Sequence, residues 1–152
     1  MRVDEGLGYL LAKAAQRWNE LLGRAFREAG FSDVRPAYGS ILVPLFDEEG
    51  MQMVELARRA GLSKQTLTTQ LRTLEERDLV IRRSDPEDGR AYRVYLGGRG
   101  REFKTAALPI LSALEEEIAA ALPRRSLATL KKQLAALMTY DKEGGGLATA
   151  TG

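Results

Sequence analysis

Cysteine and histidine are both absent from this chain of 152 residues. Without cysteine the protein has no disulfide framework and no thiol that could respond to oxidation. Without either residue it lacks the usual side-chain ligands of zinc, haem and copper, so we expect no metal site and no cofactor. The chain also has no uninterrupted run of about 18 apolar residues, the length that a membrane-spanning helix requires.

The first residues are polar and lack the apolar stretch of a signal peptide, which predicts a cytoplasmic protein without membrane partners. The length suits a single domain, large enough to bury about 70% of the surface of the unfolded chain.

The net charge of +2 is distributed unevenly along the chain. Residues 57–101 contain eleven Lys and Arg against six Asp and Glu, whereas the remainder contains twelve against fifteen. A basic segment within a slightly acidic chain is typical of a phosphate-binding face. The alternative is that this segment is only a solvated, charge-rich surface.

Residues 54–96 have the pattern of helix, tight turn, helix and β-hairpin. Gly61 stands where a helix ends, and Ser63 is a favourable N-cap for the next helix. Two strand-like runs, Leu79–Ile81 and Arg93–Leu96, flank the acidic turn at residues 85–89. The second helix would bury leucines spaced by four and three, which are Leu67, Leu71 and Leu74. This order of elements is typical of proteins that place one helix in the major groove of DNA with a β-ribbon beside it.

The same residues resemble the multiple antibiotic resistance regulator (MarR) family of winged-helix transcription factors. The resemblance covers roughly residues 5–141, and its most specific part is the wing motif Asp85-Pro86-Glu87-Asp88-Gly89-Arg90. The other matching residues are Leu56-Ala57, Leu62-Ser63, Leu74-Glu75, Leu79-Val80, Arg82-Arg83, Val94, Leu96 and Gly100. One departure is Gly97-Gly98, where the family commonly has a threonine that opens the next helix, and it predicts a looser wing.

The resemblance implies a mainly α fold with a small β-hairpin wing, in which a winged helix-turn-helix domain is embedded in a six-helix dimeric architecture. The expected organisation is an N-terminal dimerisation helix (1–34), a DNA-binding domain (35–97), C-terminal dimerisation helices (98–141) and a flexible tail (142–152). Apolar residues recur at helical spacing in both terminal regions, in excess of what one short domain covers, and so favour a homodimer. A monomeric helical bundle is the alternative.

The polar face of the second helix is predicted to read the major groove of double-stranded DNA. Gln65 is the best candidate for a bidentate contact to adenine, and Lys64 for a phosphate contact without sequence information. Ser63 is at least as well explained as a plain helix cap. The complete set predicted on this face is Ser63, Lys64, Gln65, Thr68, Thr69 and Arg72.

In the wing, Arg90 resembles the family arginine that enters the minor groove, and Asp88 resembles the partner that aims its guanidinium through an ion pair. A narrow A·T-rich groove attracts such a cation most strongly. The alternative is that Asp88-Gly89 serves only as hairpin turn chemistry. Arg82, Arg83 and Arg93 are predicted to add contacts to the DNA backbone.

The resemblance to the MarR family implies a repressor that binds a pseudopalindromic operator and is released by a small aromatic or anionic effector. Arg17, Trp18 and Tyr38 are the candidate effector-binding residues, although each is also explained as ordinary core or surface. A winged-helix module that binds protein instead of DNA is the alternative function. An enzyme is disfavoured, because His and Cys are absent and the carboxylates at 85, 87 and 88 are expected in an exposed turn.

Overall fold

The computed structural model of this chain describes residues 2–142 and 146–147. The chain divides into two compact units, residues 1–110 and residues 111–152, which are described separately.

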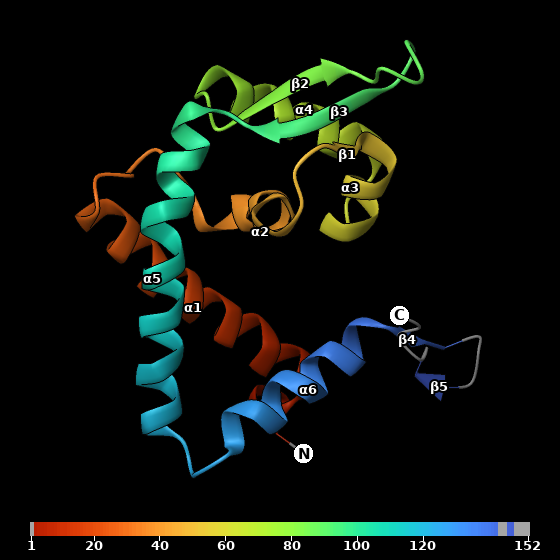
Figure 1. The fold of residues 1–152 in the computed structure, drawn as a ribbon. Coiled ribbons are helices and arrows are strands. Elements are labelled where there is room, and N and C mark those ends of the chain that lie inside the picture. Colours follow the sequence, from red (N-terminus) through yellow and green to blue (C-terminus); the bar gives the residue numbers. More distant parts are fainter. Residues whose placement is uncertain (1, 143–145, 148–152) are drawn as a thin grey trace. The chain divides into compact units, whose positions relative to one another are not determined.

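The first unit is mostly helical with a small sheet, as the sequence predicts (Figure 1). Its elements are a 3-10 turn (Val3–Glu5), α1 (Leu7–Glu28), a second 3-10 turn (Pro36–Tyr38), α2 (Gly39–Asp47), β1 (Met51–Gln52), α3 (Met53–Ala60), α4 (Lys64–Glu76), β2 (Val80–Ser84), β3 (Tyr92–Leu96) and the first half of α5 (Gly98–Ala121). The mainly α fold with a β-hairpin wing is thereby confirmed.

The helix-turn-helix forms where the capping residues predict it. Gly61 ends α3 in the left-handed conformation, with φ of 67°, which a residue with a side chain adopts at a cost. The hydroxyl of Ser63 caps α4 by accepting a hydrogen bond of 3.1 Å from the backbone N–H of Thr66. Because the three predicted leucines of α4 are fully buried, the opposite face of this helix is left to the solvent.

The sheet has three antiparallel strands in the order β1-β3-β2. The hairpin β2–β3 runs from the pair Val80 and Leu96 to the pair Ser84 and Tyr92, and the loop beyond it projects past the helices (Figure 1). The third strand, β1, was not predicted from the sequence. It contains only two residues, which is too short for an alternating pattern to be visible.

An aromatic cluster ties α5 to the helices before the wing. The ring of Phe103 meets Phe26 of α1 edge-on at 4.9 Å and Phe31 at 5.4 Å, and lies 6.0 Å from Phe46 of α2. Edge-to-face pairs of this kind contribute about 0.5–1.5 kcal/mol each beyond their burial. The start of α5 is therefore fixed against α1 and α2.

The junction between the wing and α5 is close-packed at Gly97 and Gly100, and the looser wing expected from Gly97-Gly98 stays a prediction. Asp78, at a φ of 54°, accepts a hydrogen bond of 3.3 Å from the backbone N–H of Arg99 through Oδ2 and so caps the new helix from outside. A Cβ added at Gly97 would overlap the backbone of Asp78, and one at Gly100 would overlap the carbonyl oxygen of Leu79. The glycines are what allow the turn before β2 to approach α5.

The second unit comprises the rest of α5, α6 (Ser126–Met138) and the short strands β4 (Tyr140–Asp141) and β5 (Gly146–Leu147), which pair with each other. Lys131 of α6 pairs with Glu115 of α5 at 3.0 Å. The predicted tail, residues 142–152, lies largely outside the described residues, and its described part includes β5. Among the residues that the structure describes, no helix is long and apolar enough to cross a membrane.

Candidate nucleic-acid interface

The exposed face of α4 carries the side chains predicted to read DNA. Ser63, Lys64, Gln65, Thr69 and Arg72 are exposed. Thr68 is half-buried. The polar face therefore exists as predicted, supported from behind by the buried leucines.

Three hydroxyl groups on this face already donate hydrogen bonds within the helix. Ser63 donates to the hydroxyl of Thr66 at 2.8 Å, and Thr68 and Thr69 donate to the carbonyl oxygens of Lys64 and Gln65 at 2.9 and 3.1 Å. Their remaining lone pairs can still accept from a donor outside the helix. The cap role of Ser63 is thus confirmed, and its contact with DNA stays a prediction.

The tip of the wing, residues 85–91, is ordered by backbone hydrogen bonds. The N–H of Asp85 donates to the carbonyl of Ala91 at 2.9 Å, and the N–H of Ala91 donates to the carbonyl of Asp88 at 3.0 Å. The carboxylate of Asp88 accepts from the backbone N–H of Arg90 at 3.0 Å. This contact supports the turn-chemistry alternative, because Asp88 orders the backbone at Arg90 instead of aiming its guanidinium.

Two of the three arginines predicted to contact the DNA backbone are engaged inside the protein. Arg82 forms an ion pair with Glu75 of α4 and lies over the ring of Tyr92 at 5.6 Å. Arg93 donates to Asp85 at 3.1 Å and to the carbonyl oxygen of Gly50 at 2.8 Å. Because both are half-buried in these contacts, they brace the wing.

Arg90 and Arg83 remain oriented to the solvent. Arg83 is exposed and lies over the ring of Tyr95 at 5.6 Å. Arg90 is exposed at the tip, and its guanidinium has no partner among the described residues. Of the wing arginines, Arg90 is therefore the one whose charge is least neutralised by contacts within the described residues.

A cleft of about 360 Å³ brings part of the predicted set together. It is lined by Lys64 and Thr68 from α4 and by Arg82, Asp88 and Arg90 from the wing. The other predicted residues are not among its lining residues: Ser63, Gln65, Thr69, Arg72, Arg83 and Arg93. The helix and the wing thus share one surface, which basic side chains enter from both sides.

The same cleft contains residues that sequence reasoning missed. Gln52, Met53 and Val54 line it from β1 and the start of α3, and Ala91 and Tyr92 line it from the wing. Val54 is 73% exposed at the start of α3. That exposure could have been suspected from the sequence, because Leu56 and Ala57 already account for the buried face of α3.

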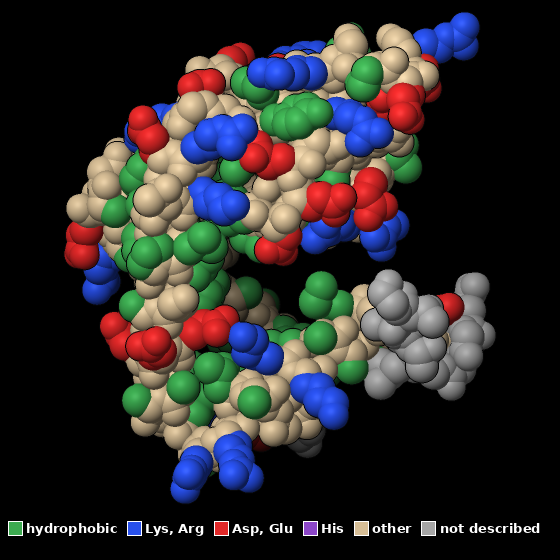
Figure 2. All heavy atoms as spheres, in the orientation of Figure 1, with side chains coloured by type: hydrophobic (Ala, Val, Ile, Leu, Met, Phe, Trp, Pro, Cys, Tyr) green, Lys and Arg blue, Asp and Glu red, His purple; other side chains and the backbone are tan. Residues whose placement is uncertain are grey.

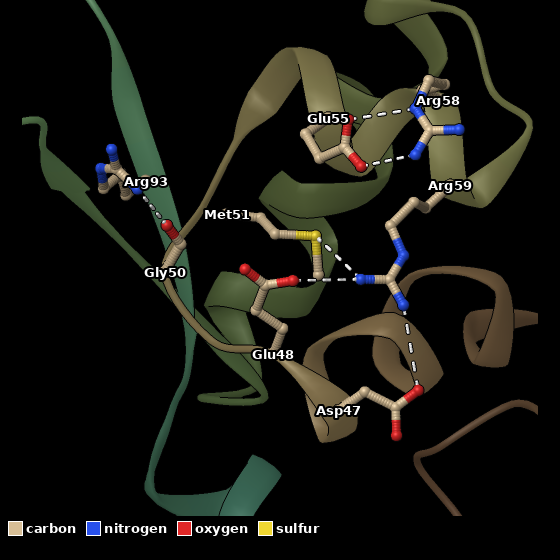
Figure 3. A network of polar contacts seen from close by, with 8 residues as sticks. All are labelled: Asp47, Glu48, Gly50, Met51, Glu55, Arg58, Arg59 and Arg93. Carbon is tan, nitrogen blue, oxygen red and sulfur yellow. Dashed lines mark hydrogen bonds and ion pairs between the residues drawn. The ribbon is translucent and has the colours of Figure 1, made fainter. Parts of the chain in front are cut away.

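Charged contacts hold α3 against the segment that precedes it (Figure 3). Arg59 reaches Glu48 at 3.4 Å, Asp47 at 3.9 Å and the sulfur of Met51 at 3.8 Å. Arg58 pairs with Glu55 on the same helix at 2.6 Å. These two arginines of the basic segment therefore form contacts within the protein. The net positive charge of residues 57–101 is larger than the charge that remains available to bind phosphates.

Asp85 corrects the expectation that all three wing carboxylates lie in an exposed turn. Its side chain is fully buried, whereas Glu87 and Asp88 are exposed. Hydrogen bonds from the backbone N–H of Glu87 and from the amide of Gln52, with the charge of Arg93, hold the pKa of the Asp85 carboxyl below its ordinary value. A carboxyl with a lowered pKa is a poor general acid, so the argument against acid catalysis stands.

Charges of both signs are mixed over the winged-helix part of the molecule (Figure 2). In the face shown, Lys and Arg side chains lie among Asp and Glu, in keeping with the number of ion pairs there. Within the described residues no group of His, Cys, Asp and Glu is arranged to hold a metal ion.

Each candidate effector residue has its own surroundings in the structure. Arg17 is exposed and pairs with Glu20 on α1 at 3.3 Å. The hydroxyl of Tyr38 accepts from Arg77 at 3.1 Å, and that guanidinium also lies over the Tyr38 ring. Trp18 is half-buried on α1. Their role in effector binding stays a prediction.

Comparison with known proteins places this geometry among DNA-binding regulators. Residues 36–92 match the model of the family described as MarR family. The chain is 35% identical over 83 residues to the transcriptional regulator HosA of Escherichia coli, covering 55% of this chain and 61% of that protein. It is 28% identical over 131 residues to an HTH-type transcriptional repressor of Mycobacterium tuberculosis, covering 86% of this chain and 92% of that one. These relatives are named as regulators and not as enzymes.

Among solved structures, the transcriptional repressor CouR bound to a 23-mer DNA duplex superposes with a TM-score of 0.77 at 26% identity. The superposition covers 90% of this chain and 94% of that one. A protein with this fold has therefore been solved in complex with DNA.

Proposed function

We propose that this chain is a sequence-specific, double-stranded DNA-binding transcriptional regulator that acts as a homodimer. The match of residues 36–92 to the MarR family supports this proposal. The observation that carries the proposal is the shared cleft, where Lys64 and Thr68 of α4 face Arg90 of the wing. A helix in the major groove and a cation in the neighbouring minor groove must straddle one sugar-phosphate strand, and a cleft between them accommodates it.

Dimerisation is supported by apolar side chains that the structure leaves on the surface. On α1, Leu7 and Leu10 are exposed. On α6 the exposed apolar residues are Leu130, Leu134, Leu137 and Met138, and hydrophobic side chains are visible along this helix in Figure 2. Exposed apolar surface on two helices is costly in water, and a second copy of the chain would cover it.

We propose repression as the direction of regulation, at a pseudopalindromic operator. Support comes from two proteins to which this chain is similar, the mycobacterial repressor and CouR, whose names describe repressors. Release by a small aromatic or anionic ligand belongs to the same proposal, with Arg17, Trp18 and Tyr38 as its candidate residues. A thermal-shift screen with phenolic acids tests it, because a ligand at 100 times its dissociation constant stabilises by about 2.7 kcal/mol.

The central experiment is a titration of the protein onto its own promoter-proximal duplex and onto random duplex of equal length, at several salt concentrations. We expect tighter binding to the promoter duplex, with the logarithm of affinity falling linearly with the logarithm of salt concentration on both. Gln65→Ala should cost about 1–3 kcal/mol on the promoter duplex and little on random DNA, with Gln70→Ala on the same helix as the control.

Equal losses on both duplexes would remove Gln65 from base recognition. Absence of binding to any duplex at low salt would instead favour the alternative, a winged-helix module that binds protein.

A further inference from the structure

The tip of the wing extends beyond the sheet that supports it. The last pair of the β2–β3 ladder is Ser84 and Tyr92, and Arg90 lies in the loop outside that pair. A two-stranded ribbon without further neighbours bends and twists readily. Something other than the ladder must therefore fix where Arg90 lies relative to α4.

The buried carboxylate of Asp85 connects the root of this loop to two strands of the sheet. Its Oδ1 accepts from the backbone N–H of Glu87 at 2.9 Å. Its Oδ2 accepts from the Gln52 amide of β1 at 2.8 Å and from the guanidinium of Arg93 on β3 at 3.1 Å. These three donors come from the loop, from β1 and from β3.

The connection continues to the segment that leads into α3. Arg93 donates its second hydrogen bond, of 2.8 Å, to the carbonyl oxygen of Gly50, and Figure 3 shows this contact beside the residues that anchor α3. Gln52 immediately precedes α3 and lines the same cleft as Arg90. One carboxylate thus joins the wing tip to the helix-turn-helix through two independent donors.

Asp85 carries a negative charge, and the burial of this charge at the root of the wing calls for a structural explanation. A buried side chain cannot touch DNA, and a negative charge beside phosphates opposes binding. Exposed turn residues could close this loop without a buried charge, as Asp88 does for the backbone of Arg90. The buried carboxylate of Asp85 is therefore explained by the two side chains whose positions it fixes, Gln52 and Arg93.

We propose that Asp85 is the positioning residue of the wing: by holding Gln52 and Arg93 it fixes the tip relative to α4, so that Arg90 reaches the minor groove while α4 occupies the major groove. This inference rests on the DNA-binding function proposed above. It assigns a role to Asp85, Gln52 and Arg93 that requires no contact between Asp85 and DNA.

The test compares Asp85→Asn with Glu87→Gln on the promoter duplex. Each variant removes one negative charge from the same loop, but the side chain of Glu87 is exposed. Removal of charge alone should tighten binding in both. We expect Asp85→Asn to weaken binding about tenfold, and Glu87→Gln to leave binding unchanged or slightly tighter.

A double-mutant cycle asks whether Asp85 acts through Arg90. In an Arg90→Ala background, Asp85→Asn should weaken binding less than about twofold, because the contact that it positions is already lost. Hydroxyl-radical protection in the minor groove should disappear in Asp85→Asn, while interference from methylated guanine N7 in the major groove persists. A merely destabilised fold would lose both signals together.

Gln52→Met provides a second route if Asp85→Asn does not fold, because it removes one donor and leaves the other two. We expect the same selective loss of minor-groove protection, in protein shown to be folded by circular dichroism. Full additivity with Arg90→Ala, or equal loss in both grooves, would overturn the inference while leaving DNA binding intact. Failure of the wild-type protein to bind any duplex would overturn the proposed function and this inference with it.

Discussion

The arginines of the basic segment differ in what their guanidinium groups contact. Arg59, Arg82 and Arg93 form ion pairs or hydrogen bonds inside the protein, whereas Arg90 is exposed. The charge of an ion-paired arginine is already partly neutralised by its carboxylate partner. Such an arginine therefore neutralises a DNA phosphate less completely, and fewer counterions are released from the DNA. The contribution of each arginine to DNA affinity therefore depends on its internal partner and not on its place in the sequence.

Arg90→Ala should weaken binding to every duplex and reduce the slope of log affinity against log salt concentration by about one. The reason is that one exposed cation, unneutralised by the fold, is removed. Filter-binding or fluorescence-anisotropy titrations from 50 to about 200 mM salt measure the slope. Arg24→Ala, an exposed arginine on α1, is the matched control and should leave the slope unchanged. An identical slope for wild type and Arg90→Ala would place Arg90 outside the interface.

At the scale of elements, the join between the wing and α5 depends on glycines that face backbone atoms. Gly97→Ala and Gly100→Ala should each destabilise the protein by about 1–3 kcal/mol, because the added methyl group meets the backbone of Asp78 or Leu79 and one of the two segments must move. Gly8→Ala on α1 is the control, since nothing lies within 4 Å of its added Cβ.

Urea unfolding followed by circular dichroism measures all three variants. The control should be neutral or stabilised, by up to about 1 kcal/mol, because alanine favours the helix more than glycine does. Equal stability of wild type and Gly97→Ala would mean that the junction yields easily, and that the tight approach to Asp78 is not needed for folding.

The elements that the sequence predicted are those whose signals are local. The cap at Ser63, the turn at Gly61 and the leucines of α4 all act within one or two helical turns, so spacing and residue type reveal them. The exposed face of α4 followed directly from the same periodicity.

What sequence could not supply were side-chain pairings across long separations. Gln52 and Asp85 are 33 residues apart, and nothing in either neighbourhood indicates that they meet. The same holds for Asp78 as the external cap of α5. The ion pairs of Arg82 with Glu75 and of Arg93 with Asp85 were likewise not foreseen, and the contacts of both arginines with DNA stay predictions.

At the scale of the whole molecule, the absence of histidine affects how the protein responds to pH. Histidine is the side chain whose ordinary pKa lies between 5 and 8, and the sequence has none. A hydrogen bond from Arg99 holds the pKa of the Asp33 carboxyl below its ordinary value, and the Asp85 carboxyl is shifted in the same direction. A lowered pKa in the folded state means that the ionised form favours folding.

The stabilising contribution of these carboxylates is complete above their unfolded pKa of about 3.9 and is lost as pH falls through the lower folded value. We therefore expect a constant free energy of unfolding between about pH 5.5 and 7, and a decline below about pH 4. Urea titrations at a series of pH values measure it. Asp33→Asn should make the decline shallower, and a transition near pH 6 in the wild type would contradict the assignment.

The whole molecule is also expected to self-associate, because the fold leaves apolar side chains on α6 uncovered. Leu130, Leu134 and Leu137 are spaced by four and three on α6, so they share one face of the helix. A charge placed on that face is desolvated if a second copy covers it and is harmless if water does. Leu134→Glu should therefore convert a dimer into a monomer in sedimentation velocity.

The matched control is Val54→Glu, which places the same charge on an exposed aliphatic position in the cleft that we propose binds DNA. It should sediment as the wild type but bind DNA more weakly, because its carboxylate faces phosphates. Leu134→Glu should also bind DNA more weakly, for a different reason: a monomer reaches one half-site, whereas a dimer holds two recognition helices about 34 Å apart. Only the loss caused by Leu134→Glu should vanish on a duplex that carries a single half-site. If Leu134→Glu sediments as a dimer, α6 does not form the interface, and the two-fold arrangement must then be sought on the exposed residues of α1.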